Sequence, residues 1–100
     1  MQNNTVFETK KDYKKLVPKM YKVILLNDNY TTFEFVIEIL KIIYKKNEEE
    51  AIYLTQKIDR EGSGIAGIYP YEIAKSKVSQ THKLAGEYNF PLKAIIEEEN

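Results

Sequence analysis

Residues 20–31 read MYKVILLNDNYT, a short apolar stretch with β-branched residues that runs into a cluster of turn formers. The apolar part predicts a buried strand over residues 21–26, which the Asn and Asp residues at 27–29 bring to an end. Asparagine and aspartate side chains offer hydrogen-bond acceptors, so this strand end is the first candidate for a binding site. Taken alone, these residues are explained more simply by an ordinary turn and a helix cap.

Two helices are predicted to follow this loop. Thr31 and Glu34 match a capping box, in which the threonine oxygen accepts a backbone N–H and the glutamate reaches back to the cap. Apolar residues then recur every three or four positions and predict one buried stripe, made of Phe33, Val36, Ile37, Leu40 and Ile43. Asn47 and Glu50 repeat the capping pattern, and a second helix continues toward Gly62.

The C-terminal half adds a strand, a helix and a strand. Residues 65–69 are too few for a helix and predict the second strand, and Pro70 stands where a helix can begin. The third helix stops before Pro91, and alternation from Leu92 predicts the last strand. The order βααβαβ predicts an α+β fold in which three helices cover one face of a small, mostly antiparallel three-stranded sheet.

Length and composition limit what this fold can do. One hundred residues supply a single domain, and Lys plus Arg equal Asp plus Glu at 15 each, so no overall charge attracts nucleic acid or membrane. Cysteine is absent and one histidine is present, so we expect no metal site and no cofactor. We expect a monomer in the cytoplasm. Residues 1–19 are mostly polar and predict a flexible N-terminal extension before a domain at 20–100.

Two features could indicate other chemistry. Residues 62–67 match the letters G-x-G-x-x-G of dinucleotide-binding turns, but here a helix enters and a strand leaves, which favours a helix stop and a tight turn. His82 lies late in the third helix without a nucleophile partner, so we interpret it as a solvated helix residue. An enzyme using Asp28 and Asp59 as acid and base lacks a nucleophile and a metal set. We therefore expect a binding protein and no enzyme.

The opening run, with Glu34-Phe35-Val36 after it, resembles the start of ClpS, the bacterial adaptor of the AAA+ Clp protease. Further blocks keep the family's spacing without a gap: Glu61-Gly62, Gly67-Ile68-Tyr69, Glu72-Ile73-Ala74, Lys77-Val78 and Pro91-Leu92. The resemblance spans residues 20–99. It implies a ClpS-like fold and an adaptor that binds N-degrons, the destabilising first residues Leu, Phe, Tyr or Trp. Such an adaptor delivers these proteins to the N-domain of the Clp unfoldase, ClpA or an equivalent.

The resemblance also implies the residues of the site. It assigns the substrate α-amino group to Asn27 and the first substrate backbone amides to Asp28. A free α-amino group is a cationic donor at neutral pH, so its pocket must offer acceptors. Asp59 stands where the family usually has a histidine that contacts this group, and it keeps an acceptor while adding a charge. The implied side-chain pocket consists of Leu26, Thr31, Phe33, Val36, Thr55, Ile58 and Leu92.

The implied docking surface for the unfoldase contains Tyr30, Glu72 and Lys77, and residues 1–19 match the family's mobile extension that engages it. Phe33 and Thr55 stand where the family commonly has methionines, so we expect an altered preference among Leu, Phe, Tyr and Trp. The alternative is a protein-docking domain like the C-terminal domain of ribosomal protein L7/L12, which shares a similar overall fold. Such a domain has no reason to carry an acceptor loop beside an apolar pocket.

Overall fold

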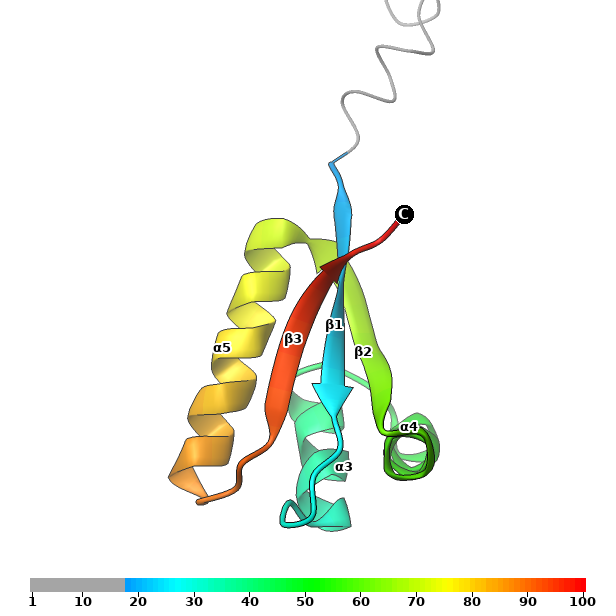
Figure 1. The fold of residues 1–100 in the computed structure, drawn as a ribbon, viewed down its shortest axis with the longest axis vertical. Coiled ribbons are helices and arrows are strands. Elements are labelled where there is room, and N and C mark those ends of the chain that lie inside the picture. Colours follow the sequence, from blue (N-terminus) through cyan, green and yellow to red (C-terminus); the bar gives the residue numbers. More distant parts are fainter. Residues whose placement is uncertain (1–17) are drawn as a thin grey trace, which may run out of the picture.

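The computed structural model describes residues 18–100, which form a three-stranded sheet with three helices (Figure 1). In chain order the elements are β1 (Met20–Leu26), α3 (Phe33–Ile42), α4 (Glu48–Glu61), β2 (Ser63–Pro70), α5 (Tyr71–Glu87) and β3 (Lys93–Glu98). The predicted order βααβαβ and the α+β class are confirmed. The proposed extension at 1–19 lies almost wholly outside the described residues. Among those described, no helix has the length and apolar character to cross a membrane.

The sheet has the strand order β2-β1-β3, and both pairings are antiparallel. At one end Leu26 pairs with Ser63 on β2 and with Lys93 on β3. At the other end Met20 pairs with Pro70. Because β1 is central, the loop that follows it emerges between the starts of β2 and β3. The sheet thus brings residues 27–31 close to the end of α4 and to the segment before β3.

The core lies between the sheet and the helices; in Figure 1, α3 lies behind the sheet, α5 to its left and α4 to its lower right. Val23 and Leu25 of β1 are fully buried, and α3 contributes Ile39 and Leu40. Burying a side chain of this size stabilises the fold by about 1.5–3 kcal/mol. The remaining buried apolar residues include Phe35, Val36, Ile43, Tyr44, Ala51, Ile58, Ala66, Ala74, Ala85, Leu92 and Ala94.

The predicted stripe on α3 is correct at Val36, Leu40 and Ile43 and wrong at Phe33. Phe33 is 45% exposed, and Phe35 occupies the core instead. Phe33 is the first residue of the helix, next to the N-cap, and there the helix extends past the end of the sheet. A periodic pattern gives the buried face of a helix but does not show where the neighbouring layer stops.

The two predicted capping boxes have different outcomes. The box of Asn47 and Glu50 is confirmed, since each side chain accepts the backbone N–H of the other residue. The box at Thr31 is wrong, because Thr32 is the N-cap and accepts the Phe35 N–H at 3.1 Å. The Thr31 hydroxyl donates instead to the Asp28 carboxylate at 2.7 Å. The Asp28 carboxylate, three residues before Thr31, thus engages the Thr31 hydroxyl and leaves the neighbouring Thr32 to cap the helix.

Gly62 ends α4 in the left-handed conformation, with φ of 94°. Its N–H donates to the Ile58 carbonyl at 2.8 Å, and β2 begins at the next residue. Glycine takes this conformation without the steric cost that other residues meet. The glycine-rich segment is therefore the predicted helix stop and turn, and β2 is longer than predicted because it spans residues 63–70.

The interpretation of His82 as a purely solvated residue is wrong. The residue is exposed, but its Nε2 accepts the backbone N–H of Ala94 at 3.0 Å. β3 is an edge strand, and edge strands carry backbone groups that no neighbouring strand satisfies. His82 therefore satisfies one such group and connects α5 to β3.

Candidate functional site

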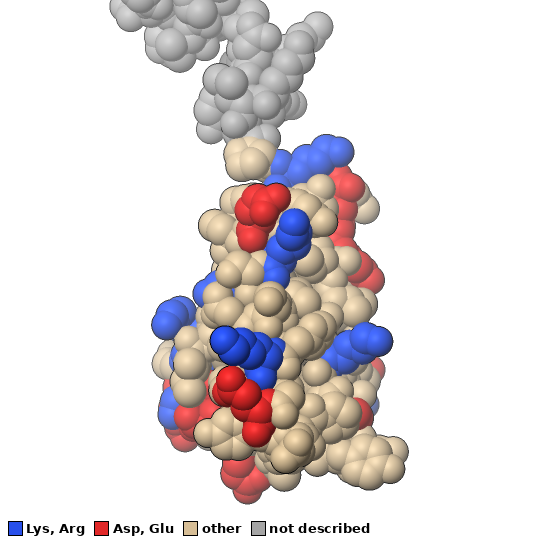
Figure 2. All heavy atoms as spheres, turned by 90° about the vertical axis from the view of Figure 1, so that its left-hand side faces the viewer, with Lys and Arg blue, Asp and Glu red and all other residues tan. Residues whose placement is uncertain are grey.

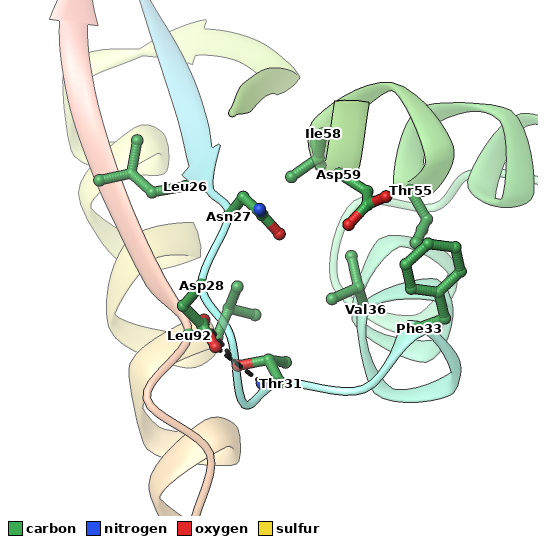
Figure 3. Close-up of a pocket in the computed structure, with 10 residues that line it drawn as sticks. All are labelled: Leu26, Asn27, Asp28, Thr31, Phe33, Val36, Thr55, Ile58, Asp59 and Leu92. Carbon is green, nitrogen blue, oxygen red and sulfur yellow. Dashed lines mark hydrogen bonds between the residues drawn. The ribbon is translucent and has the colours of Figure 1, made fainter. Parts of the chain in front are cut away.

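A cavity of about 40 Å³ lies where the loop after β1, the start of α3, the last turns of α4 and the segment before β3 meet (Figure 3). That is room for about three water molecules. It is lined by Leu26, Asn27, Asp28, Thr31, Phe33, Val36, Thr55, Ile58, Asp59 and Leu92. The structure thus brings together all the residues that the sequence predicted for α-amino binding, backbone binding and the side-chain pocket.

The loop is fixed to α4 through its backbone. The Asn27 N–H donates to the Gly62 carbonyl at 2.8 Å, so the glycine that ends α4 also holds the first loop residue. This contact was not predicted from the sequence. Gly62 indicated a helix stop and a turn, but nothing in the sequence indicated that its carbonyl accepts the Asn27 N–H.

Asp28 organises the rest of the loop. Its Oδ1 accepts the backbone N–H groups of Tyr30 and Thr31 at 2.8 and 2.7 Å, and its Oδ2 accepts the Thr31 hydroxyl. Burial opposes the charged carboxylate, but the hydrogen bonds from Thr31 and Tyr30 outweigh it and lower the pKa of Asp28 below its ordinary value. An ionised carboxylate has about four acceptor positions, so about one is left for a ligand.

Asn27 and Asp59 form a polar rim. Both are exposed, and no hydrogen bond or ion pair within residues 18–100 engages either side chain. Figure 3 shows the Asn27 amide and the Asp59 carboxylate pointing toward one another across the opening. An amide oxygen and a carboxylate both accept hydrogen bonds, and the carboxylate adds a negative charge. This pair can hold a cationic donor such as an ammonium group.

The interior behind the rim is apolar. Val36, Ile58 and Leu92 are buried and line the cavity from α3, α4 and the segment before β3. Phe33 lies at the edge, where nearly half of its side chain is exposed. Thr55 is buried and lines the cavity from α4 together with Ile58. A charged rim over an apolar interior suits a ligand that is an amine at one end and a hydrocarbon at the other.

The sequence model of the family described as ATP-dependent Clp protease adaptor protein ClpS matches residues 17–95 of this chain. The chain belongs to the ClpS family. A curated ClpS adapter of Nautilia profundicola is 57% identical over 98 residues, covering 98% of this chain and 99% of the relative. One from Wolinella succinogenes is 53% identical over 81 residues, 81% of this chain and 79% of the relative.

A solved structure has the same fold. Agrobacterium tumefaciens ClpS2 bound to L-phenylalaninamide matches with a TM-score of 0.80 at 36% identity, covering 83% of this chain and all of that one. The predicted ClpS-like fold and adaptor role are therefore confirmed. The alternative, an L7/L12-like docking domain without an N-terminal residue pocket, is not favoured.

The three residues assigned to unfoldase docking do not lie together. Tyr30, in the loop after β1, is 76% exposed. Glu72 is in the first turn of α5, beside the opposite end of β1. Seven strand residues separate the two ends, a length of about 20 Å. Part of the surface that a ClpS partner would contact must therefore lie at each end of the sheet if all three residues take part.

Lys77 already has contacts within the fold. Its ammonium donates to the Ile43 carbonyl at 2.7 Å, near the end of α3, and lies 5.6 Å from the centre of the Tyr69 ring. Figure 2 looks onto the side of the ClpS domain that carries α5 and shows basic and acidic side chains interspersed. This face therefore has no single-sign patch in the described part of the chain, in keeping with the balanced charge of the sequence.

Proposed function

We propose that the pocket binds the free N-terminal residue of substrate proteins when that residue is Leu, Phe, Tyr or Trp, and that the domain delivers these proteins to the Clp protease. The observation that carries the proposal is the rim of two facing acceptors, Asn27 and Asp59, above an apolar interior. L-Phenylalaninamide, which ClpS2 of Agrobacterium tumefaciens binds, has a free α-amino group and an aromatic side chain. Both parts of that molecule find matching groups here.

In this proposal Asn27 and Asp59 bind the α-amino group. Aspartate in place of the usual family histidine places a carboxylate against the ammonium group, so both partners of this hydrogen bond carry a charge. Asp28 has a double role, because it holds the loop through three hydrogen bonds and offers its last acceptor position to a substrate backbone amide. The function needs binding and release and no bond cleavage, so no catalytic group is required.

The first side chain of the substrate enters the apolar interior. Burial of a Leu or Phe side chain there contributes about 1.5–3 kcal/mol. The cavity of about 40 Å³ is small for such a group, so Phe33 must turn outward to admit it. Phe33 is at the first position of α3 and is half-exposed, which leaves it free to do so.

The proposed partner is the N-domain of a Clp AAA+ unfoldase, ClpA or an equivalent, and the adaptor acts as a monomer. Residues 1–19 join β1 at the end opposite the pocket, which is the end that carries Glu72. The extension can therefore engage the unfoldase while the pocket holds the substrate. The protease depends on ATP, so we assign this activity to the cytoplasm, and a cysteine-free sequence suits that reducing compartment.

Binding of free and N-acetylated peptides tests the proposal. We expect a labelled peptide that begins with Leu or Phe to bind, and the same peptide to lose at least about tenfold in affinity when acetylated, because acetylation removes the cationic donor. Asp59→Asn should weaken the free peptide alone. Glu61→Gln is the matched control, since it removes the same charge from the same helix outside the pocket. Equal binding of both peptide forms would overturn the assignment.

Unfoldase docking needs a separate test. Glu72 is exposed and pairs only with Lys75 one turn later, at 3.8 Å, among the described residues. We expect Glu72→Ala to weaken capture of the unfoldase N-domain while peptide affinity and unfolding temperature stay unchanged. Lys77 is a poorer probe, because its loss also removes the hydrogen bond to Ile43. Unchanged capture by Glu72→Ala would remove this residue from the docking surface.

A further inference from the structure

Thr55 has a buried hydroxyl without a hydrogen-bond partner. The residue is 2% exposed, lines the pocket, and its Oγ1 is the one buried side-chain polar atom left unpaired in the described part of the chain. A threonine inside a helix commonly donates to the carbonyl four residues earlier, which here is that of Ala51, but this bond is absent. Buried polar groups in native proteins nearly always have partners, so an exception calls for a ligand or another explanation.

The Thr55 side chain lies one turn of α4 away from the rim residue Asp59. Thr55 and Asp59 are four residues apart on α4 and therefore share one face, about 6 Å apart along the helix axis. Figure 3 shows both side chains on the side of α4 that faces the cavity. Asp59 is exposed, whereas Thr55 is buried. A ligand whose ammonium lies at Asp59 and whose side chain runs along α4 into the pocket places the far end of that side chain near Thr55.

The first residues proposed for this pocket differ in what they offer at the far end of the side chain. Leucine and phenylalanine end in hydrocarbon. Tyrosine ends in a hydroxyl, which donates and accepts as a threonine hydroxyl does. The indole N–H of tryptophan only donates and lies on the side of the ring system rather than at its tip. The ligand group that pairs with the Thr55 hydroxyl is thus a hydroxyl at the para position of an aromatic ring, as in tyrosine.

We propose that Thr55 determines specificity in this pocket by exchanging a hydrogen bond with the phenolic hydroxyl of an N-terminal tyrosine, so that tyrosine is preferred over phenylalanine. This inference rests on the proposed function. Phenylalanine would fill the pocket and exclude water while leaving the Thr55 hydroxyl unpaired, and tyrosine would pair it. A site that holds a buried polar group rejects the ligand that lacks its partner.

Peptides that differ only in a first Tyr or Phe test the inference against wild type, Thr55→Val and Thr55→Ser. We expect wild type to bind the Tyr peptide about tenfold more tightly, as one hydrogen bond of this kind allows. Thr55→Val keeps the shape and removes the hydroxyl, so it should lose about tenfold for Tyr and bind Phe equally or more tightly. Thr55→Ser keeps the hydroxyl and should retain the preference for Tyr.

Three results would overturn the inference: wild type without a preference for Tyr, a Tyr-to-Phe ratio that is unchanged in Thr55→Val, or an equal loss for both peptides. The first result is measured on wild type alone, so the inference can be refuted even if a variant folds poorly. Comparing free with N-acetylated peptides distinguishes a failure of the proposed function from a failure of the role of Thr55. If free and acetylated peptides bind alike, the proposed function fails; if only the Tyr-to-Phe ratio disagrees, the role of Thr55 fails alone.

Discussion

Two buried helical threonines, Thr81 and Thr55, lie in regions that differ in how their polar groups are satisfied. The Thr81 hydroxyl is 2.8 Å from the Lys77 carbonyl, to which it donates, and 2.7 Å from the Tyr44 hydroxyl. The Thr55 hydroxyl is also buried and has no partner among residues 18–100. The contact between α5 and the turn after α3 is therefore completed by the domain's own groups. The pocket wall, by contrast, keeps one unpaired hydroxyl, to which a bound ligand can supply the hydrogen-bond partner.

The complete region is the Tyr44 cluster, which consists of Tyr44, Lys77 and Thr81. Burial raises the pKa of Tyr44 to about 12, although the hydrogen bond with Thr81 opposes this change. The tyrosine hydroxyl therefore stays protonated at any physiological pH. The Lys77 ammonium donates to the Ile43 carbonyl and so satisfies one of the free carbonyls at the end of α3. These bonds join the turn after α3 to α5 across more than thirty residues of sequence.

The largest expected effect comes from breaking the Tyr44 cluster. Thr81→Val leaves the buried Tyr44 hydroxyl with only a long contact of 3.4 Å to the Lys77 carbonyl. An unsatisfied buried hydroxyl costs about 1–3 kcal/mol, and each kcal/mol lowers the unfolding temperature of a domain this size by about 4–8 °C. Thermal and urea unfolding measure the loss, and peptide affinity should not change. Stability equal to wild type would contradict the contrast between the two threonines.

Gly64→Ala tests whether the pocket wall is packed as tightly as the core. A Cβ on Gly64 would lie 2.8 Å from the Ile58 Cγ1 and 3.0 Å from the Leu54 Cδ1. The end of Leu54 can rotate away, but the Ile58 Cγ1 is close to the backbone and cannot, so we expect a loss of about 1–3 kcal/mol. Ile58 lines the pocket, so peptide affinity should fall in the same variant.

Gly86→Ala is the matched control for this substitution. Gly86 lies in α5, and an added Cβ would meet nothing within 4 Å. Alanine in a helix interior is favoured over glycine by about 0.8–1.0 kcal/mol, and Gly86 is in the last turn, so this variant should be as stable as wild type or gain less than that amount, and it should bind peptide as wild type does. If Gly64→Ala destabilises the fold and leaves peptide affinity intact, the wall at Ile58 is not coupled to the pocket.

Thr55→Val is the counterpart of Thr81→Val. Replacing an unpaired buried hydroxyl with a methyl group of similar shape removes a desolvation penalty and breaks no hydrogen bond. We therefore expect the unfolding free energy of the peptide-free domain to be unchanged or to rise by up to about 1 kcal/mol. Urea unfolding of the two variants side by side gives the comparison directly. A loss as large as that of Thr81→Val would mean that Thr55 has a partner in the folded domain after all.

The sequence predicts the elements well, because these depend on local patterns. A strand that ends in acceptors, followed by an apolar helix face, puts polar groups beside a hydrophobic surface. The roles of these residues and the full lining of the pocket came from the family resemblance, which includes residues far along the chain such as Asp59 and Leu92. By contrast, the choice of Thr32 over Thr31 as the cap depends on a carboxylate that either residue could have contacted. Local patterns do not decide between such neighbours.

Long-range hydrogen bonds are the part that the sequence could not predict. Tyr44, in the turn after α3, and Thr81, in α5, are 37 residues apart, and nothing in the local sequence marks them as partners. Lys77 was assigned to a docking surface by resemblance, and its contact with Ile43 became visible only in the fold. The unpaired state of Thr55 is likewise a property of packing. Its apolar surroundings could be expected from the helix pattern, but the absence of a partner could not.

Asp28 lines the pocket, as Thr55 does, but its hydrogen bonds are satisfied within the domain, as those of Thr81 are. The pH dependence that Asp28 gives to stability is the smallest expected effect. The folded pKa is lowered by the hydrogen bonds of Thr31 and Tyr30, whereas the unfolded value is about 3.9. Between these two values the unfolded chain binds more protons, so stability rises with pH there. The contribution of Asp28 is thus fully present above about pH 4–5 and is lost as the pH falls through the folded pKa.

The variant Asp28→Asn isolates this contribution. The amide cannot ionise and cannot accept hydrogen bonds at both of its terminal atoms, so it loses the contact that Oδ2 makes with the Thr31 hydroxyl in its present form. Urea unfolding between about pH 2 and 7 should give a stability difference from wild type that is constant near neutrality and shrinks below about pH 4. The side chain is only partly buried, so the change will be modest. A difference that does not vary with pH would mean that the loop is held by its backbone bond to Gly62 and not by the Asp28 charge.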